Sequence, residues 1–110
     1  MSLDFYLVKR CTCREMEEEL FWKNITHNLG KMAAEAGIYK CLWHPEEETK
    51  AKDIIGNLED GLKKLKDDPQ HYRKFDNPGG WGKYENFVNF VEVVLDACIE
   101  FPDAEVVTST

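Results

Sequence analysis

Hydrophobic and polar positions divide the chain into segments with different periods. Leu and Phe alternate with other residues over 2–9, a period of two that predicts a strand. A polar segment without Gly or Pro follows, and 20–25 resumes a strand-like pattern with the bulky Phe21 and Trp22. These two segments predict a hairpin with a loose connection.

Helical spacing replaces this alternation in the middle of the chain. Apolar residues predict a short helix over 28–36, with Gly37 at its C-terminal cap, and 38–43 can add another helical turn. A clean apolar stripe predicts a longer helix over 46–66. Pro45 would take the first helical position there, and the glutamates after it would favour the positive end of the helix dipole.

The last third of the chain predicts a short helix, a helix with a wide apolar face, and a strand. The short helix starts at 67–69 and ends near Phe75, and the glycines and proline of 76–82 exclude regular structure. The helix over 83–100 should be buried on two sides, between the sheet and another helix. Residues 104–108 are rich in β-branched side chains and predict a strand that pairs with the first. The predicted class is therefore α+β, a small antiparallel sheet packed by three to four helices in the order β-β-α-α-α-β.

Composition limits the classes of function. A chain of 110 residues with 43% apolar residues can form one domain with a hydrophobic core. The net charge of −7 disfavours direct binding to nucleic-acid phosphates, and it suits either a basic protein partner or simple solubility. We find no secretory signal and no membrane span, and so expect a soluble, cytoplasmic protein with reduced cysteines, in which Cys98 is a core residue.

Polar side chains crowd the junction between the predicted hairpin and the first helix. Asn24, Thr26, His27 and Asn28 lie within five positions, although one capping oxygen would suffice there. Thr26 or Asn28 can cap the helix, and His27 could act as a general base or bind a ligand. The alternative is a structural corner in which the two asparagines satisfy buried backbone groups.

Trp81 lies between glycines and has two interpretations. It could be an exposed binding anchor on a loop, with Tyr84 close by. It could equally fold back and close the core, because a tryptophan buries a large apolar area. The glycines around it form no phosphate-binding pattern.

Three thiols and one imidazole form a possible zinc set. These residues are Cys11, Cys13, Cys41 and His44. The alternative is an unrelated pair of hairpin-loop cysteines, a buried Cys41 and an exposed His44. Cys-x-Cys is tighter than the usual structural zinc knuckle, and the domain needs no metal to fold, so we expect no cofactor and keep zinc as the alternative.

Several segments resemble a family of small proteins of bacteria and their phages whose function is not known. The shared pattern includes Asn-Ile-Thr-His-Asn-Leu-Gly at 24–30 and Gly-Trp-Gly-Lys-Tyr-Glu at 80–85, and the resemblance covers nearly the whole chain. Members of this family usually lack the cysteine pair and often have Arg in place of His44, which weakens the zinc interpretation. The resemblance implies a role in host takeover or defence evasion.

We therefore expect a binding or inhibitor module that acts on a host protein, and not an enzyme, because no catalytic constellation can be assembled from the spacing. The expected binding surface adds Trp43 to the residues named above; its members are Asn24, Thr26, His27, Asn28, Trp43, Trp81 and Tyr84. The alternative is a small-molecule or nucleotide-binding domain, or a minor enzyme, with His27 as acid or base and the Trp81 loop as a lid.

Overall fold

The structure is a computed structural model, and it describes most of the chain. The described ranges are 2–11, 16–26, 29–46, 49–75 and 83–109. The strands are β1 (Ser2–Cys11), β2 (Met16–Thr26) and β3 (Glu105–Ser109). The helices are α1 (Gly30–Glu35), α2 (Tyr39–Trp43), α3 (Ala51–Asp67), α4 (Pro69–Arg73) and α5 (Tyr84–Glu100).

The three strands form an antiparallel sheet in the order β2-β1-β3. Strand β1 pairs with β2 along its whole length, from Ser2 opposite Thr26 to Cys11 opposite Met16. The register shifts between Leu7 and Val8, where Leu20 is the extra residue of a bulge on β2. Strand β3 pairs with the other edge of β1, as the sequence predicted, and the α+β class is confirmed.

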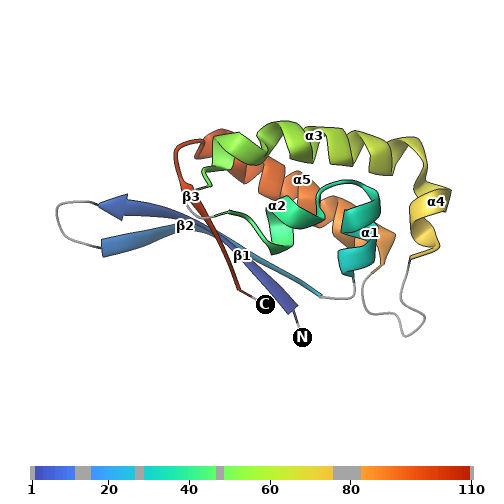
Figure 1. The fold of residues 1–110 in the computed structure, drawn as a ribbon, viewed down its shortest axis with the longest axis horizontal. Coiled ribbons are helices and arrows are strands. Elements are labelled where there is room, and N and C mark those ends of the chain that lie inside the picture. Colours follow the sequence, from blue (N-terminus) through green and yellow to red (C-terminus); the bar gives the residue numbers. More distant parts are fainter. Residues whose placement is uncertain (1, 12–15, 27–28, 47–48, 76–82, 110) are drawn as a thin grey trace.

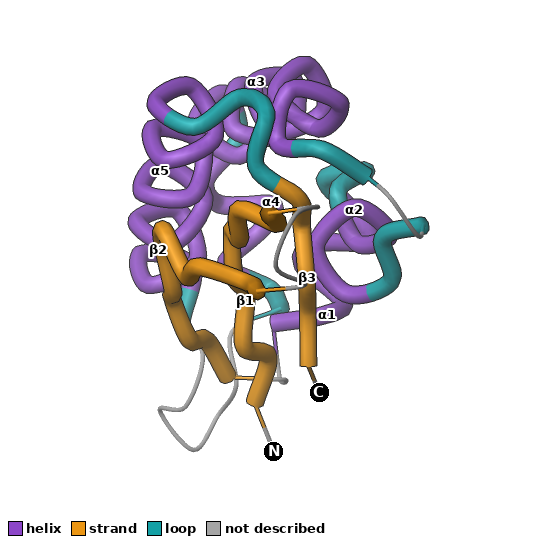
Figure 2. The backbone as a smooth tube through the Cα atoms, turned by 90° about the vertical axis from the view of Figure 1, so that its left-hand side faces the viewer, coloured by secondary structure: helices purple, strands orange, loops and turns teal. Residues whose placement is uncertain are grey.

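The helices cover one face of this sheet (Figure 1). Helix α5 lies between the sheet and α3, so its wide apolar face is buried on two sides as expected (Figure 1). Figure 2 shows the sheet from the hairpin end, with β3 running beside β1 and α3 at the top. Within the described ranges, no helix is long and apolar enough to cross a membrane.

Alternation along β1 decides which side chains enter the core. Leu3, Phe5 and Leu7 are fully buried on the face that the helices cover. They meet the apolar side chains of α5, among which Phe87 and Phe90 are also buried. Cys98 belongs to this core, as predicted, and burial raises the pKa of its thiol to about 12.

The helix that we predicted over 46–66 begins five residues later, at Ala51. Pro45 and Glu46 precede it and are not helical. The N–H groups of Ala51 and Lys52 donate to the carbonyls of Ala104 and Pro102, at 2.8 and 2.9 Å. These carbonyls satisfy two of the N–H groups that a helix start leaves without partners. The segment before β3 therefore fixes the start of α3, and the charge pattern could not show this.

The predicted capping residue of the first helix is also different. Helix α1 begins at Gly30 with Leu29 as its N-cap, and this cap makes no side-chain hydrogen bond. Thr26 is instead the last residue of β2. The predicted C-terminal cap is confirmed, because Gly37 has a φ of 79° and the N–H of Ile38 donates to Ala33.

Two glycines of α3 differ in their surroundings and give a matched test of packing. A Cβ added at Gly61 would lie 2.5 Å from Cγ2 of the buried Ile38, whereas one added at Gly56 would meet nothing within 4 Å. We expect Gly61→Ala to lower the free energy of unfolding by about 1–3 kcal/mol through overpacking. Gly56→Ala should raise it by about 0.5–1 kcal/mol through helix propensity. Urea unfolding measures both, and a Gly61→Ala protein as stable as the unmodified chain would contradict this packing.

Candidate functional site

The residues of the predicted polar junction do not all lie in the described ranges. His27, Asn28 and Trp81 fall outside them, so their predicted roles, including the Trp81 lid, stay predictions. Asn24 is exposed on β2, and its Nδ2 donates to Oδ1 of Asp4 on β1 at 2.6 Å. Thr26 ends the same strand and is half-buried.

Trp43 and Tyr84 are core residues, which corrects their predicted place on an open surface. Trp43 is 2% exposed and stacks on Tyr39, with 5.3 Å between the ring centroids. Its buried Nε1 has no hydrogen-bond partner in the described part of the chain. Tyr84 is 7% exposed. Neither side chain can contribute to a solvent-open surface in this structure. Burial of their large aromatic area in the core outweighs exposure of their polar atoms to solvent.

The hydroxyl of Tyr84 has a structural task. It donates to the carbonyl of Leu65 in the last turn of α3 at 2.6 Å. The residue four positions after Leu65 is Pro69, which has no N–H to donate, so the phenol takes the place of a helical partner. The guanidinium of Arg73 lies 5.0 Å from the centroid of the Tyr84 ring. Desolvation is the main cause of a raised pKa at this phenol, and the positive charge of Arg73 opposes it.

The predicted zinc set is only partly described. Cys13 and the side chain of Cys11 lie outside the described residues. The Cys41 thiol donates to the carbonyl of Ile38 at 3.2 Å, and His44 Nε2 lies 3.3 Å from the hydroxyl of Tyr39. Where the side chains are described, no three His, Cys, Asp or Glu residues gather as a metal site.

The outer face of the sheet, opposite the helices, carries a row of apolar side chains. Trp22 on β2 and Val107 on β3 flank Tyr6 on β1 in the paired register. Because alternate residues of a strand point to opposite faces, the three point away from the core that holds Phe5 and Leu7. Trp22 is 52% exposed, while Tyr6 and Val107 are half-buried. We call Trp22, Tyr6 and Val107 the outer-face row.

Polar and acidic residues surround this row. On one side lie Asp4 and its paired residues Asn24 and Ser109, and on the other lie Glu19 and Glu105, which pair with Val8. Neither Lys nor Arg occurs at these paired positions of the three strands. The cation of β2, Lys23, pairs with Phe5 and so belongs to the covered face. The positions next to the outer-face row are therefore acidic or neutral, an acidic surround, with Lys50 bridged to Glu105 beyond it.

Sequence reasoning missed the outer-face row, although a signal for it was present. Tyr6 and Val8 are apolar at positions that a one-faced strand would give to polar residues, and Trp22 occupies the matching position on β2. An antiparallel sheet covered on one face normally alternates apolar and polar residues. A second apolar set in such strands indicates a second buried surface or a binding surface.

Comparisons with known proteins add no further assignment. No family model and no curated protein matches the sequence, and no solved structure matches the fold. The resemblance to small bacterial and phage proteins therefore depends on its sequence segments alone, and the functional argument depends on the residues described above.

Removal of one hydroxyl tests the bond between Tyr84 and Leu65. We expect Tyr84→Phe to lower the free energy of unfolding by about 1–2 kcal/mol, because the buried Leu65 carbonyl loses its donor. Tyr6→Phe removes an outer-face hydroxyl and should change stability by less than about 0.5 kcal/mol. Chemical denaturation of the two variants measures the difference, and equal effects would contradict the assigned bond.

Reactivity of the Cys41 thiol tests its environment. Burial raises the pKa of this thiol from 9.0 to about 11, so the protonated form dominates at neutral pH. Only the thiolate is nucleophilic, so alkylation should be slow at pH 7–9 and should accelerate as the pH approaches 11. The alkylation rate is measured with iodoacetamide in a Cys11→Ser, Cys13→Ser protein, and mass spectrometry of its peptides identifies the modified cysteine. Rapid modification of the folded protein at pH 8 would contradict this environment.

Proposed function

We propose that this chain is a small acidic module that binds a basic protein of a bacterial host through the outer face of its sheet. The observation that carries the proposal is the half-exposed Trp22 at the edge of the outer-face row. The bacterial setting comes from the resemblance of its sequence segments to bacterial and phage proteins.

The composition of the outer-face row supports a protein partner. Tryptophan and tyrosine are enriched among the residues that dominate binding energy in protein interfaces, where they bury large area with few rotatable bonds. Trp22 and Tyr6 are such residues, and they lie side by side on neighbouring strands. Helices occupy the other face of the sheet, so the outer-face row is the aromatic surface of the sheet that remains open to a partner (Figure 1).

Charge supports a basic partner. Asp4 and Glu19 bring carboxylates to opposite sides of the row, and the whole chain has a net charge of −7. Complementary charge increases association rates and suppresses partners of the wrong sign. Aromatic sheet faces also bind single-stranded nucleic acids, but those faces pair their aromatics with cations that neutralise phosphates. The acidic surround of Trp22 and Tyr6 favours a protein over a nucleic acid.

A matched pair of variants tests the role of Trp22. Among the described residues, Ile99 is the other large apolar side chain with a similar exposed fraction, 56%, and it lies on α5. The immobilised unmodified chain, Trp22→Ala and Ile99→Ala are compared for the proteins that they retain from a bacterial lysate. We expect a basic protein, identified by mass spectrometry, on the unmodified chain and on Ile99→Ala. Its affinity for Trp22→Ala should be at least about 30-fold lower, as for a hot-spot residue.

Two controls complete this test. All three proteins should unfold at similar denaturant concentrations, because both side chains are largely exposed. Retention should also decrease as salt rises from about 50 to 300 mM, since exposed charges are screened over shorter distances. The proposal fails if Trp22→Ala and Ile99→Ala retain the same proteins, or if the retained protein is acidic.

A further inference from the structure

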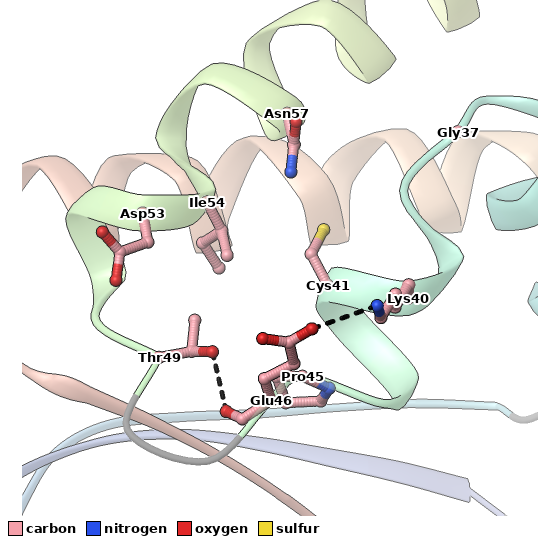
Figure 3. A pocket seen from close by; sticks show the side chains of 9 residues that line it. All are labelled: Gly37, Lys40, Cys41, Pro45, Glu46, Thr49, Asp53, Ile54 and Asn57. Carbon is pink, nitrogen blue, oxygen red and sulfur yellow. Dashed lines mark hydrogen bonds and ion pairs between the residues drawn. The ribbon is translucent and has the colours of Figure 1, made fainter.

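A pocket of about 350 Å³ opens between α2 and α3, away from the outer-face row (Figure 3). Its size is at the small end of the range of about 300–1,000 Å³ that small-molecule sites occupy. The Cys41 sulfur comes from α2, and Ile54 and Asn57 come from α3 (Figure 3). Ile54 is 3% exposed and supplies an apolar wall. The connection between the two helices supplies the remaining side, with Glu46 and Thr49.

The walls of this pocket are fixed by contacts elsewhere in the fold. Ile38, next to α2, packs against Gly61 of α3 so closely that no Cβ fits there. The carbonyl of Thr49 accepts from the N–H of Val106 on β3 at 2.8 Å. Thr49 is thus tied to the sheet, and the segment that leads into α2 is packed on α3, so these described walls of the pocket are held in place by the fold.

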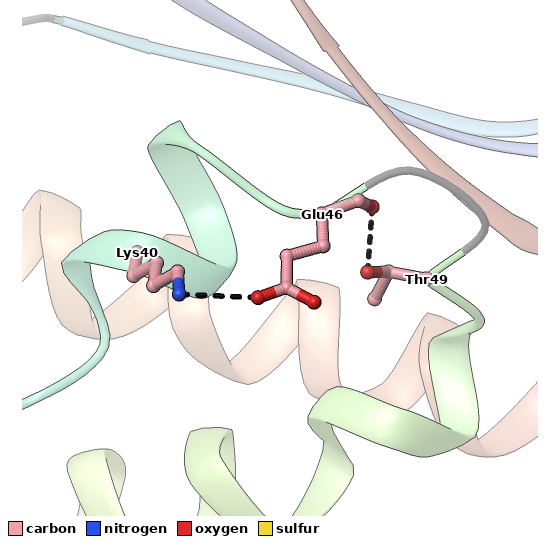
Figure 4. Close-up of polar contacts among 3 residues, drawn as sticks. All are labelled: Lys40, Glu46 and Thr49. Atoms are coloured by element: carbon pink, nitrogen blue, oxygen red, sulfur yellow. Dashed lines mark hydrogen bonds and ion pairs between the residues drawn. The ribbon is translucent and has the colours of Figure 1, made fainter.

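Hydrogen-bond acceptors dominate the lining. The Thr49 hydroxyl donates its proton to the carbonyl of Glu46 at 2.7 Å, so its lone pairs remain as acceptors (Figure 4). The Cys41 thiol likewise donates to the carbonyl of Ile38, and its sulfur is a weak acceptor on the pocket side. The carboxylates of Glu46 and Asp53 can only accept; Oδ2 of Asp53 already accepts from the N–H of Lys50 at 3.0 Å, which leaves its Oδ1 for a ligand.

Hydrogen-bond donors are fewer among these side chains, and the charged donor, Lys40, is already paired. The ammonium of Lys40 lies 3.3 Å from Oε1 of Glu46 (Figure 4). Asn57 adds an amide that can donate or accept. With two carboxylates and one ammonium, the described lining residues have a net charge of −1, and the whole chain has −7. Both the hydrogen-bond inventory and the electrostatic field favour a ligand that brings donors and positive charge.

We infer that this pocket binds a small organic cation, a primary ammonium or guanidinium compound with a short apolar body. The cationic group interacts with the carboxylates of Glu46 and Asp53, and the apolar body lies against Ile54 and Pro45. A ligand with a carboxylate in place of the cation would face two like charges and a single paired cation. The site therefore discriminates by charge sign among ligands of the same shape.

Three probes of nearly equal shape and different charge test this inference. Benzylamine, benzyl alcohol and benzoate are titrated separately into the isotope-labelled full chain at pH 7, and the amide resonances are followed by NMR. We expect saturable shifts with benzylamine, concentrated in α2, in the connection and in the first two turns of α3. Benzyl alcohol and benzoate should bind at least about ten-fold more weakly, because charge-assisted hydrogen bonds are lost.

Charge-removing variants on the same helix supply the matched control. Asp53→Asn and Glu46→Gln each remove a carboxylate that lines the pocket, and each should weaken benzylamine binding by about three- to ten-fold. Asp60→Asn removes an exposed carboxylate of α3 outside the lining and should leave binding unchanged. Equal binding of all three probes, shifts spread over the whole surface, or an Asp60→Asn effect as large as that of Asp53→Asn would overturn the inference. The folded spectrum of each variant shows that the pocket is intact.

Discussion

Strand β1 has hydrogen-bonded neighbours on both edges, β2 on one side and β3 on the other, and this central position constrains the rest of the molecule. Its inward residues, among them Phe5, form the floor on which α5 packs. Its outward residues, among them Tyr6, determine what the open face can recognise. Because the period of a strand is two, a shift of one residue in its register would exchange these faces and destroy the core and the outer-face row together.

Helix α5 connects the sheet to the outer helix layer, which contains α3. It is apolar over most of its circumference and lies between the sheet and α3 (Figure 1). The end of α3 is held from α5 by the Tyr84 hydroxyl, and its start is held by the carbonyls of Pro102 and Ala104, which follow α5. Both ends of α3 are therefore positioned by the same neighbouring segment. On the other side of α3, Gly61 is in contact with Ile38, the residue before α2, and this contact brings α2 and α3 together at the pocket.

Local patterns were sufficient to predict the elements, their order and the pairing of the last strand with the first. Alternation in β1, the stripe in α3 and the wide face of α5 each reflect burial, which the sequence records directly. The start of α3 was mispredicted because its first N–H groups are satisfied from Ala104, more than fifty residues away. Trp43 and Tyr84 were placed on a surface because a large aromatic side chain with a polar atom suits either a core or an interface. The Glu46–Thr49 side of the pocket was unpredictable because the helix was expected to include it.

The position of β3 has a consequence for the order of events during synthesis. The second edge of β1 finds its partner only in residues 105–109, about a hundred positions later in the chain. Loop closure over such a separation is slow, and non-local strand pairing delays folding. A nascent chain that lacks these residues exposes an unpaired edge of β1 beside two apolar faces, the combination that invites association with other chains. The three-stranded sheet can therefore form only after residues 105–109 have been translated.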